Sequence, residues 1–349
     1  MRRVLSIISS IIIYLVVSSP ALARVSGVCS NCHTMHYSQT PQPSEWGTSG
    51  PYQALLINNC VGCHSGTNTG SNKTPYIFSS TAPTYGATGT EGDTLAGGNF
   101  YWVANGNNTA GHNVAGICGA DTLSIPPGFT NTYPDIEGNT VGGGTWPAGQ
   151  QVTCAGTYGC HGHHNTTDQV KAIYGAHHTD DTTIDGNSVG TSYRFLMGIL
   201  GKEDSDWEYQ PTSTTHNQYY GVDRSAVPNK QTISYLCAEC HGYYHSITKV
   251  GTTSPWLRHP TDFDMNNVST KEYGNYPGDG SKTYSVIAPV GSVDVSAVKS
   301  QVLVSSGDAI VMCTSCHRAH GTPYFKLMRW NYQGSSTGGN CSICHTTKN

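Results

Sequence analysis

The chain has 349 residues, and only 11% of them are charged, against an average of roughly 25% in soluble proteins. Thirteen cysteines and 16 histidines exclude an ordinary cytosolic enzyme with a few scattered thiols. The low charge argues against a long acidic or basic disordered tail. No basic patch stands out, so nucleic acid is not an expected partner.

Residues 1–23 are typical of a secretory signal peptide. Arg2 and Arg3 form a basic start, residues 4–17 are mostly apolar, and Ala21 and Ala23 supply the small residues of a cleavage site. The apolar run has 14 residues, whereas a membrane span requires about 20. We therefore expect cleavage after Ala23 and an exported chain, located outside the cell or on the outer-membrane surface, with the periplasm as the alternative.

Ten of the 13 cysteines fall in five copies of the pattern Cys-x-x-Cys-His, which is the attachment signature of c-type haem. Two thiols bind the two vinyl groups of one porphyrin, and the adjacent histidine becomes the proximal iron ligand. The expected thioether cysteines are Cys29, Cys32, Cys60, Cys63, Cys237, Cys240, Cys313, Cys316, Cys341 and Cys344. The expected proximal ligands at these five sites are His33, His64, His241, His317 and His345.

A sixth site is irregular, because five residues instead of two separate Cys154 from Cys160, which precedes His161. Glycines at 156 and 159 make a looped-out segment feasible, since glycine tolerates unusual backbone angles. Cys154, Cys160 and His161 then hold a sixth covalent haem c and leave Cys118 over. The alternative is a Cys118–Cys154 disulfide with the haem attached through Cys160 only, which leaves no unpaired thiol in an oxidising compartment.

Six low-spin haems need six further axial ligands, and ten histidines remain. The distal ligands that we favour are His36, His112, His178, His216, His259 and His320. His36 and His320 each stand three residues after a proximal histidine, and a helical turn would put both members of such a pair on one face. His178 follows a short helical pattern at 168–174 that ends at Gly175. The reserve candidates are His177, His245, His164 and His163.

The attachment sites begin at residues 29, 60, 154, 237, 313 and 341, so a close pair stands at each end of the chain. We expect one domain over 24–349, with an N-terminal paired module at 24–70, a middle part at 71–280 and a C-terminal paired module at 281–349. Segments 65–153 and 179–232 read as long loops, residues 283–312 as two or three short strands, and short helices follow several motifs. The expected fold class is a loop-rich multihaem cytochrome c, with short helices and a few short strands packed around a chain of stacked haems.

A close pair of attachment motifs stands at each end of the chain. The C-terminal pair is Cys313-Thr-Ser-Cys-His-Arg-Ala-His with Cys341-Ser-Ile-Cys-His, and the N-terminal pair is Cys29-Ser-Asn-Cys-His-Thr-Met-His with Cys60-Val-Gly-Cys-His. Both pairs resemble the doubled-CXXCH class of multihaem c-type cytochromes. The whole chain is similar to exported hexahaem cytochromes of metal-reducing bacteria, some of which form filaments. This resemblance implies low-spin haems with two histidine ligands and electron transport to or across the cell exterior.

Two functions remain open at this stage. The first is electron transfer without enzymatic turnover, with other periplasmic or outer-membrane cytochromes, a metal oxide or another extracellular acceptor, and further copies of this chain as partners. The second is a multihaem reductase of nitrite, hydroxylamine or a sulfur oxyanion. A reductase needs one haem with an open axial position, and the irregular site at 154–161 is the best candidate for it.

Mass spectrometry of the intact protein distinguishes the two arrangements of the odd cysteine. Six haems with one thiol open to alkylation are expected if Cys154 and Cys160 both bind haem. Six haems without a reactive thiol would instead show that Cys154 pairs with Cys118.

Overall fold

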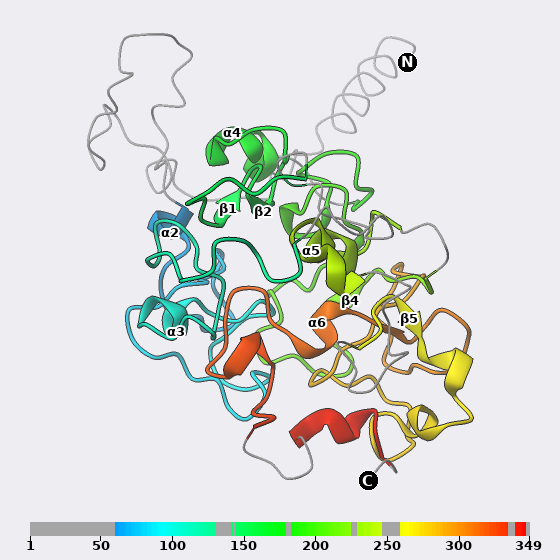
Figure 1. Ribbon diagram of the computed structural model, residues 1–349. Coiled ribbons are helices and arrows are strands. Elements are labelled where there is room, and N and C mark those ends of the chain that lie inside the picture. The colour runs from blue at the N-terminus through cyan, green and yellow to red at the C-terminus, as the bar shows by residue number, and fades with distance from the viewer. Residues whose placement is uncertain are drawn as a thin grey trace, which may run out of the picture.

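The computed structural model describes residues 60–129, 141, 144–178, 183–224, 229–245, 259–333 and 339–346. The predicted signal peptide, the attachment site at 29–33 and His36 lie outside the described residues. Most of the described chain runs in loops that connect very short elements (Figure 1). The loop-rich fold expected from the sequence is therefore confirmed.

Helices in the described ranges are short, and the longest spans nine residues. The α-helices are α2 (Cys60–Cys63), α3 (Tyr101–Ala104), α4 (Gln169–Ala172), α5 (Ile233–His241) and α6 (Cys313–Cys316). The 3-10 helices are η3 (Ala176–His178), η4 (Tyr193–Phe195), η5 (Gly242–His245), η6 (Met265–Val268), η7 (Glu272–Asn275), η8 (Phe325–Leu327) and η9 (Gly339–Ile343). Since isolated helices of this length are unstable in water, contacts with the rest of the chain must hold them.

Two of these helices have side-chain caps that explain where they begin. The Asp168 carboxylate accepts the backbone N–H groups of Val170 and Lys171 at the start of α4. Gly175 follows with a positive φ of 78°, so the helical pattern predicted at 168–174 is confirmed. The Thr232 hydroxyl accepts the N–H of Tyr235 and starts α5.

Three two-stranded sheets are present in the described residues. The pairs are parallel β1 (Thr153–Ala155) with β2 (Gly159–His161), antiparallel β3 (Gly201–Lys202) with β4 (Gln218–Tyr219), and antiparallel β5 (Phe263–Asp264) with β6 (Ile310–Val311). The predicted strands at 283–312 are reduced to β6 and the isolated bridges Thr283–Gln301 and Gly291–Ile310. Short, separated pairs of this kind cannot form an extended sheet.

The apolar core is divided into four small clusters of buried residues. The largest contains Met265, Tyr276, Tyr284 and Trp330, and the partly buried Cys316, Cys341 and Cys344 pack against it. A second cluster has Cys118 and Cys154 at its edge, and a third has Cys240. The remaining cluster is built around Tyr193, Leu196 and Tyr219. Motif cysteines thus lie at the margins of three clusters, where an attached porphyrin would add apolar surface to each.

No helix in these described ranges combines the length and the apolar character that crossing a membrane requires.

We expect the chain to unfold when haem attachment is prevented, because the clusters are small and the helices and strands are too short to persist alone. The test uses a variant that lacks all motif cysteines, and it is compared with the haem-loaded protein by circular dichroism during heating. The expected result is a gradual, non-cooperative change for the variant. A sharp cooperative transition in the haem-free chain would contradict it.

Candidate haem-binding sites

Four attachment motifs in the described chain share one local conformation, a helical turn that begins at or before the first cysteine. Cysteines three apart on such a turn lie on one face, so both thiols point to the same side. At three motifs the backbone N–H of the histidine donates to the carbonyl of the first cysteine, at 3.0 Å for His64, 3.1 Å for His317 and 2.9 Å for His345. His241 closes α5 in the same position. Each of these helices therefore contains at least one motif cysteine, and at one of the four motifs a short helix also follows, since η5 begins directly after His241.

The irregular site brings its two cysteines together by strand pairing. Parallel β1 and β2 align Thr153 with Gly159 and Ala155 with His161, so Cys154 and Cys160 stand directly opposite each other. Neighbouring strands lie about 4.8 Å apart. Pairing of β1 with β2 thus brings together two cysteines that are separated by five residues, as a helical turn does for cysteines separated by two residues.

Two glycines make this tight return possible. Gly156 has a φ of +88°, and its N–H donates to the carbonyl of His161 at 3.1 Å. A Cβ atom on Gly159 would lie 2.6 Å from the backbone nitrogen of Ala155, closer than real Cβ atoms approach. The two glycines therefore allow the looped-out segment between Cys154 and Cys160 that the sequence suggested.

Cysteines of successive sites are neighbours in space. The Cys60 thiol is close enough to affect the charge of Cys154, and the Cys313 thiol that of Cys237. Cys160 is close enough to affect the charge of Cys240 electrostatically. Cys316 stands in the same relation to Cys341. The elements that carry these cysteines can be traced in Figure 1 from α2 through β1 and β2, then α5 and α6, to the C-terminal helix.

Cys118 remains a free thiol in the structure, as does Cys154. The Sγ atom of Cys118 lies 3.8 Å from the carbonyl oxygen of Val114, and burial raises the pKa of this thiol. The Cys154 thiol also lies near that of Cys60, whose charge affects it.

Four motif histidines face a second histidine. The centroid distances are 6.4 Å for His64–His177, 6.1 Å for His112–His241, 6.4 Å for His161–His320 and 6.0 Å for His259–His345. A histidine nitrogen binds a transition metal at about 2 Å. Two rings on opposite sides of one metal ion therefore have centroids about 6 Å apart, since each centroid lies about 1 Å behind its nitrogen.

Each motif histidine in the described residues is anchored through Nδ1 to an oxygen from outside its own motif. The acceptors are the carbonyls of Pro75 (His64, 2.9 Å), Arg194 (His161, 3.0 Å), Pro127 (His241, 2.6 Å) and Lys326 (His317, 2.8 Å), and the carboxylate of Glu272 (His345, 2.9 Å). His112 likewise donates to the carbonyl of Ala319 at 2.6 Å. A ring that donates through Nδ1 presents the lone pair of Nε2 to a metal, as metal-bound histidines usually do.

Burial lowers the pKa of His64, His112, His161 and His317. It lowers the pKa of His241 to about 4 and that of His320 to about 3, with the neighbouring histidines His112 and His161, respectively, lowering them further. Only the neutral imidazole has a lone pair for iron. Paired thiols, Nδ1-anchored rings and facing imidazoles together fit a covalently attached haem c with two axial histidines.

Two of the favoured distal candidates, His216 and His178, are not in these four histidine pairs. His216 is buried and stacks on Tyr284 at 3.6 Å, with Nδ1 2.8 Å from the Asn217 carbonyl and Nε2 3.3 Å from the Lys299 carbonyl, so both nitrogens already face oxygen atoms. His178 is exposed at the end of η3, whereas the half-buried His177 faces His64. A run of two adjacent histidines gave no local signal to distinguish them.

The other reserve histidines have different neighbours. His164 Nδ1 lies 2.7 Å from Glu239, and His245 Nε2 lies 3.1 Å from Asp262. His163 is exposed. His317 faces no second histidine ring among the described residues, while His36 lies outside them. The proposed helical relation between His317 and His320 is wrong, because α6 ends at Cys316 and His317 is extended.

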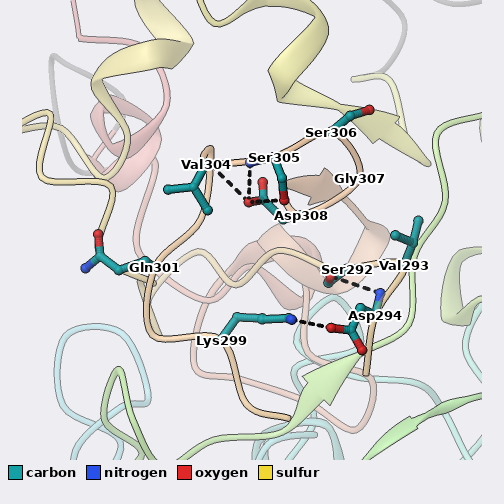
Figure 2. Close-up of a pocket in the computed structure, with 10 residues that line it drawn as sticks. All are labelled: Ser292, Val293, Asp294, Lys299, Gln301, Val304, Ser305, Ser306, Gly307 and Asp308. Carbon is teal, nitrogen blue, oxygen red and sulfur yellow. Dashed lines mark hydrogen bonds and ion pairs between the residues drawn. The ribbon is translucent and has the colours of Figure 1, made fainter. Parts of the chain in front are cut away.

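A small surface pocket of about 130 Å³ is unrelated to these sites (Figure 2). Its lining, at residues 292–294, 299, 301 and 304–308, contains neither cysteine nor histidine. Asp308 accepts the N–H groups of Leu303, Val304 and Ser305, and Asp294 pairs with Lys299. Because its two carboxylates are engaged within the chain, this pocket offers no site for haem or metal.

Comparison with known proteins independently supports covalently attached c-type haem. Residues 304–349 match a family model described as the doubled CXXCH motif. The chain is 26% identical over 357 residues to the C-type cytochrome OmcS of Geobacter sulfurreducens, covering 87% of this chain and 78% of the relative. The chain thus carries the doubled CXXCH motif over residues 304–349 and is similar as a whole to a C-type cytochrome.

Two solved structures are similar to this chain, and each comparison covers 88% of this chain and 84% of the other. One is the outer membrane cytochrome S filament from Geobacter sulfurreducens, with 18% identity and a TM-score of 0.45. The other is the OmcS nanowire from the same organism, with 20% identity and a TM-score of 0.40.

Replacing Gly159 with alanine tests the irregular site, because the new Cβ would push β2 away from β1. We expect G159A to lose the haem at Cys160 and to be destabilised by about 1–3 kcal/mol, the usual cost of overpacking. Intact mass and thermal unfolding are measured. G119A is the matched control, since a Cβ there meets nothing within 4 Å. Full haem content and unchanged stability in G159A would contradict the strand-paired site.

Proposed function

We propose that this chain is an exported electron-transfer cytochrome whose six haems form a continuous line, with low-spin iron held by two histidines at the four sites where two rings face each other. The observation that supports this most strongly is the set of four histidine pairs at 6.0–6.4 Å. Two histidines on one iron leave no position for a substrate. Haem supplies one-electron oxidation and reduction when bound.

The proposed order of the haems in space is their order in the sequence. The adjacent thiols Cys60 and Cys154 join the second site to the third, and Cys237 and Cys313 join the fourth to the fifth. The electrostatic neighbours Cys160 and Cys240 support contact between the third and fourth sites. Cys316 and Cys341 support the last link. Electrons would then pass along the chain without a long gap.

The proposed axial pairs revise the distal ligands. His112, His259 and His320 keep this role, opposite His241, His345 and His161. His177 takes the place opposite His64. His178 and His216 are no longer proposed at these four sites, for the reasons of exposure and carbonyl contacts given above. His36 remains a predicted distal ligand outside the described residues.

The protein's contribution to electron transfer is to hold these ligands still. Hydrogen bonds from Nδ1 to carbonyl oxygens fix the orientation of His64, His112, His161, His241 and His317, and a bond to the Glu272 carboxylate fixes that of His345. Neither the rings nor their anchors have to move when one electron arrives. The irregular site, which was the best candidate for an open haem of a reductase, has His320 facing His161. The electron-transfer function is therefore favoured over the reductase.

Export and assembly complete the proposal. The signal peptide at 1–23 would send the chain out of the cytoplasm, where periplasmic or outer-membrane cytochromes could reduce it and a metal oxide or other extracellular acceptor could oxidise it. The first attachment site begins at residue 29 and the last proximal histidine is His345. Haems near both ends of the chain would let copies join end to end in a conducting filament.

Carbon monoxide binding to the reduced holoprotein tests the function, because the gas needs an open axial position. We expect no spectral change on addition of carbon monoxide to the wild type, whereas a reductase would bind it at one haem or more. Rapid binding by the native protein would overturn the proposal.

A pair of single variants tests the ligand assignment. H177A should open one haem, adding a high-spin ferric signal in electron paramagnetic resonance and one carbon monoxide site. H178A is the comparison variant, because His178 is exposed at the end of η3, and it should not open the haem attached at Cys60 and Cys63. The reverse result would restore His178 as the distal ligand.

A further inference from the structure

Two arginines of this weakly charged chain are buried. Arg318 is 2% exposed and Arg329 is 1% exposed. Among the ion pairs of the described residues, none joins either guanidinium to a carboxylate. Burying an unpaired charge is costly, so such groups are retained only where something favours the charge.

Arg318 is stabilised by neutral groups. Its Nη1 donates to the carbonyls of Leu95 (2.9 Å) and Ala96 (2.8 Å), and its Nη2 to those of Thr88 (3.3 Å) and Gly89 (2.7 Å). Four carbonyl oxygens replace water around the cation but do not cancel its charge. The positive field of Arg318 therefore persists inside the protein.

Arg329 is fastened to the helical turn that carries two haem cysteines. Its backbone N–H donates to the carbonyl of Cys316 at 2.8 Å, and its side-chain Nε donates to the carbonyl of Thr314 at 2.7 Å. Arg318 directly follows His317, and its N–H donates to Leu327 at 2.9 Å. Both arginines thus border the attachment site formed by α6 and His317.

The charges of Arg329 and Glu208 both act on Arg318, besides its burial. The buried Glu208 carboxylate accepts hydrogen bonds from the Asn217 N–H (2.9 Å) and the Tyr219 hydroxyl (3.3 Å). No ion pair of the described residues joins Glu208 to either guanidinium.

We propose that Arg318 and Arg329 raise the reduction potential of the haem attached at Cys313 and Cys316, which makes it the strongest electron acceptor in the line. This proposal rests on the proposed electron-transfer function. Taking up one electron from the adjacent haem removes one positive charge from the iron site. Nearby buried cations favour that state, and a low local dielectric strengthens the effect. The fifth site would thus hold an electron longest.

Potentiometric titration of the full-length holoprotein tests this, with R329Q compared with R329K. In R329Q we expect the most positive transition to move to lower potential by at least a tenfold change in the reduction equilibrium, which is 59 mV for one electron. R329K keeps the charge and should keep the wild-type position. R318Q, which leaves the Thr314 contact intact, should shift the same transition in the same direction.

The controls separate this proposal from the proposed function. Haem content and low-spin resonance spectra are recorded for every variant. Fully loaded, low-spin R329Q and R318Q proteins with wild-type titrations would overturn the role of the arginines and leave electron transfer standing. An equal shift in R329K and R329Q would also overturn it, because packing and not charge would then be responsible. High-spin iron in the wild type would count against the proposed function itself.

Discussion

The structure depends on one recurrent hydrogen bond, from Nδ1 of a motif histidine to an oxygen of a segment outside its own motif. His64, His161, His241, His317 and His345 all have it. The bond does two things, since it sets the tautomer that presents Nε2 to iron and it ties a loop to each attachment site. A chain with four small apolar clusters and elements of two to nine residues gains much of its connectivity in this way.

The sequence predicts the attachment motifs because their chemistry is local. Cysteine spacing identifies the motifs wherever they occur, and Asp168 with Gly175 correctly indicated a short helix. His112, His259 and His320 were among the predicted distal ligands, but the motif histidine that each one faces could not be predicted. His112, for example, meets the carbonyl of Ala319 across 207 residues, and no local pattern encodes such a contact. His177 and His178 differ only in which of them the single turn of η3 directs inward. His216 was attractive as a loop histidine, but it stacks on Tyr284 instead.

Two local conformations converge on one requirement, which is that two thiols lie side by side before a histidine. A helical turn does this at Cys60, Cys313 and Cys341, and parallel strand pairing does it for Cys154 and Cys160. The sequence indicated that glycine would be needed in the longer separation. It did not indicate the strand pairing, because a three-residue strand has too little pattern to be recognised.

A density map of the haem-loaded protein at a resolution that shows iron ligands tests the central claim most directly. The account predicts one iron between the rings of His64 and His177, His112 and His241, His161 and His320, and His259 and His345. It also predicts that the irons follow the order of their motifs in the sequence. An open face on any of these four irons, or a different spatial order, would contradict it.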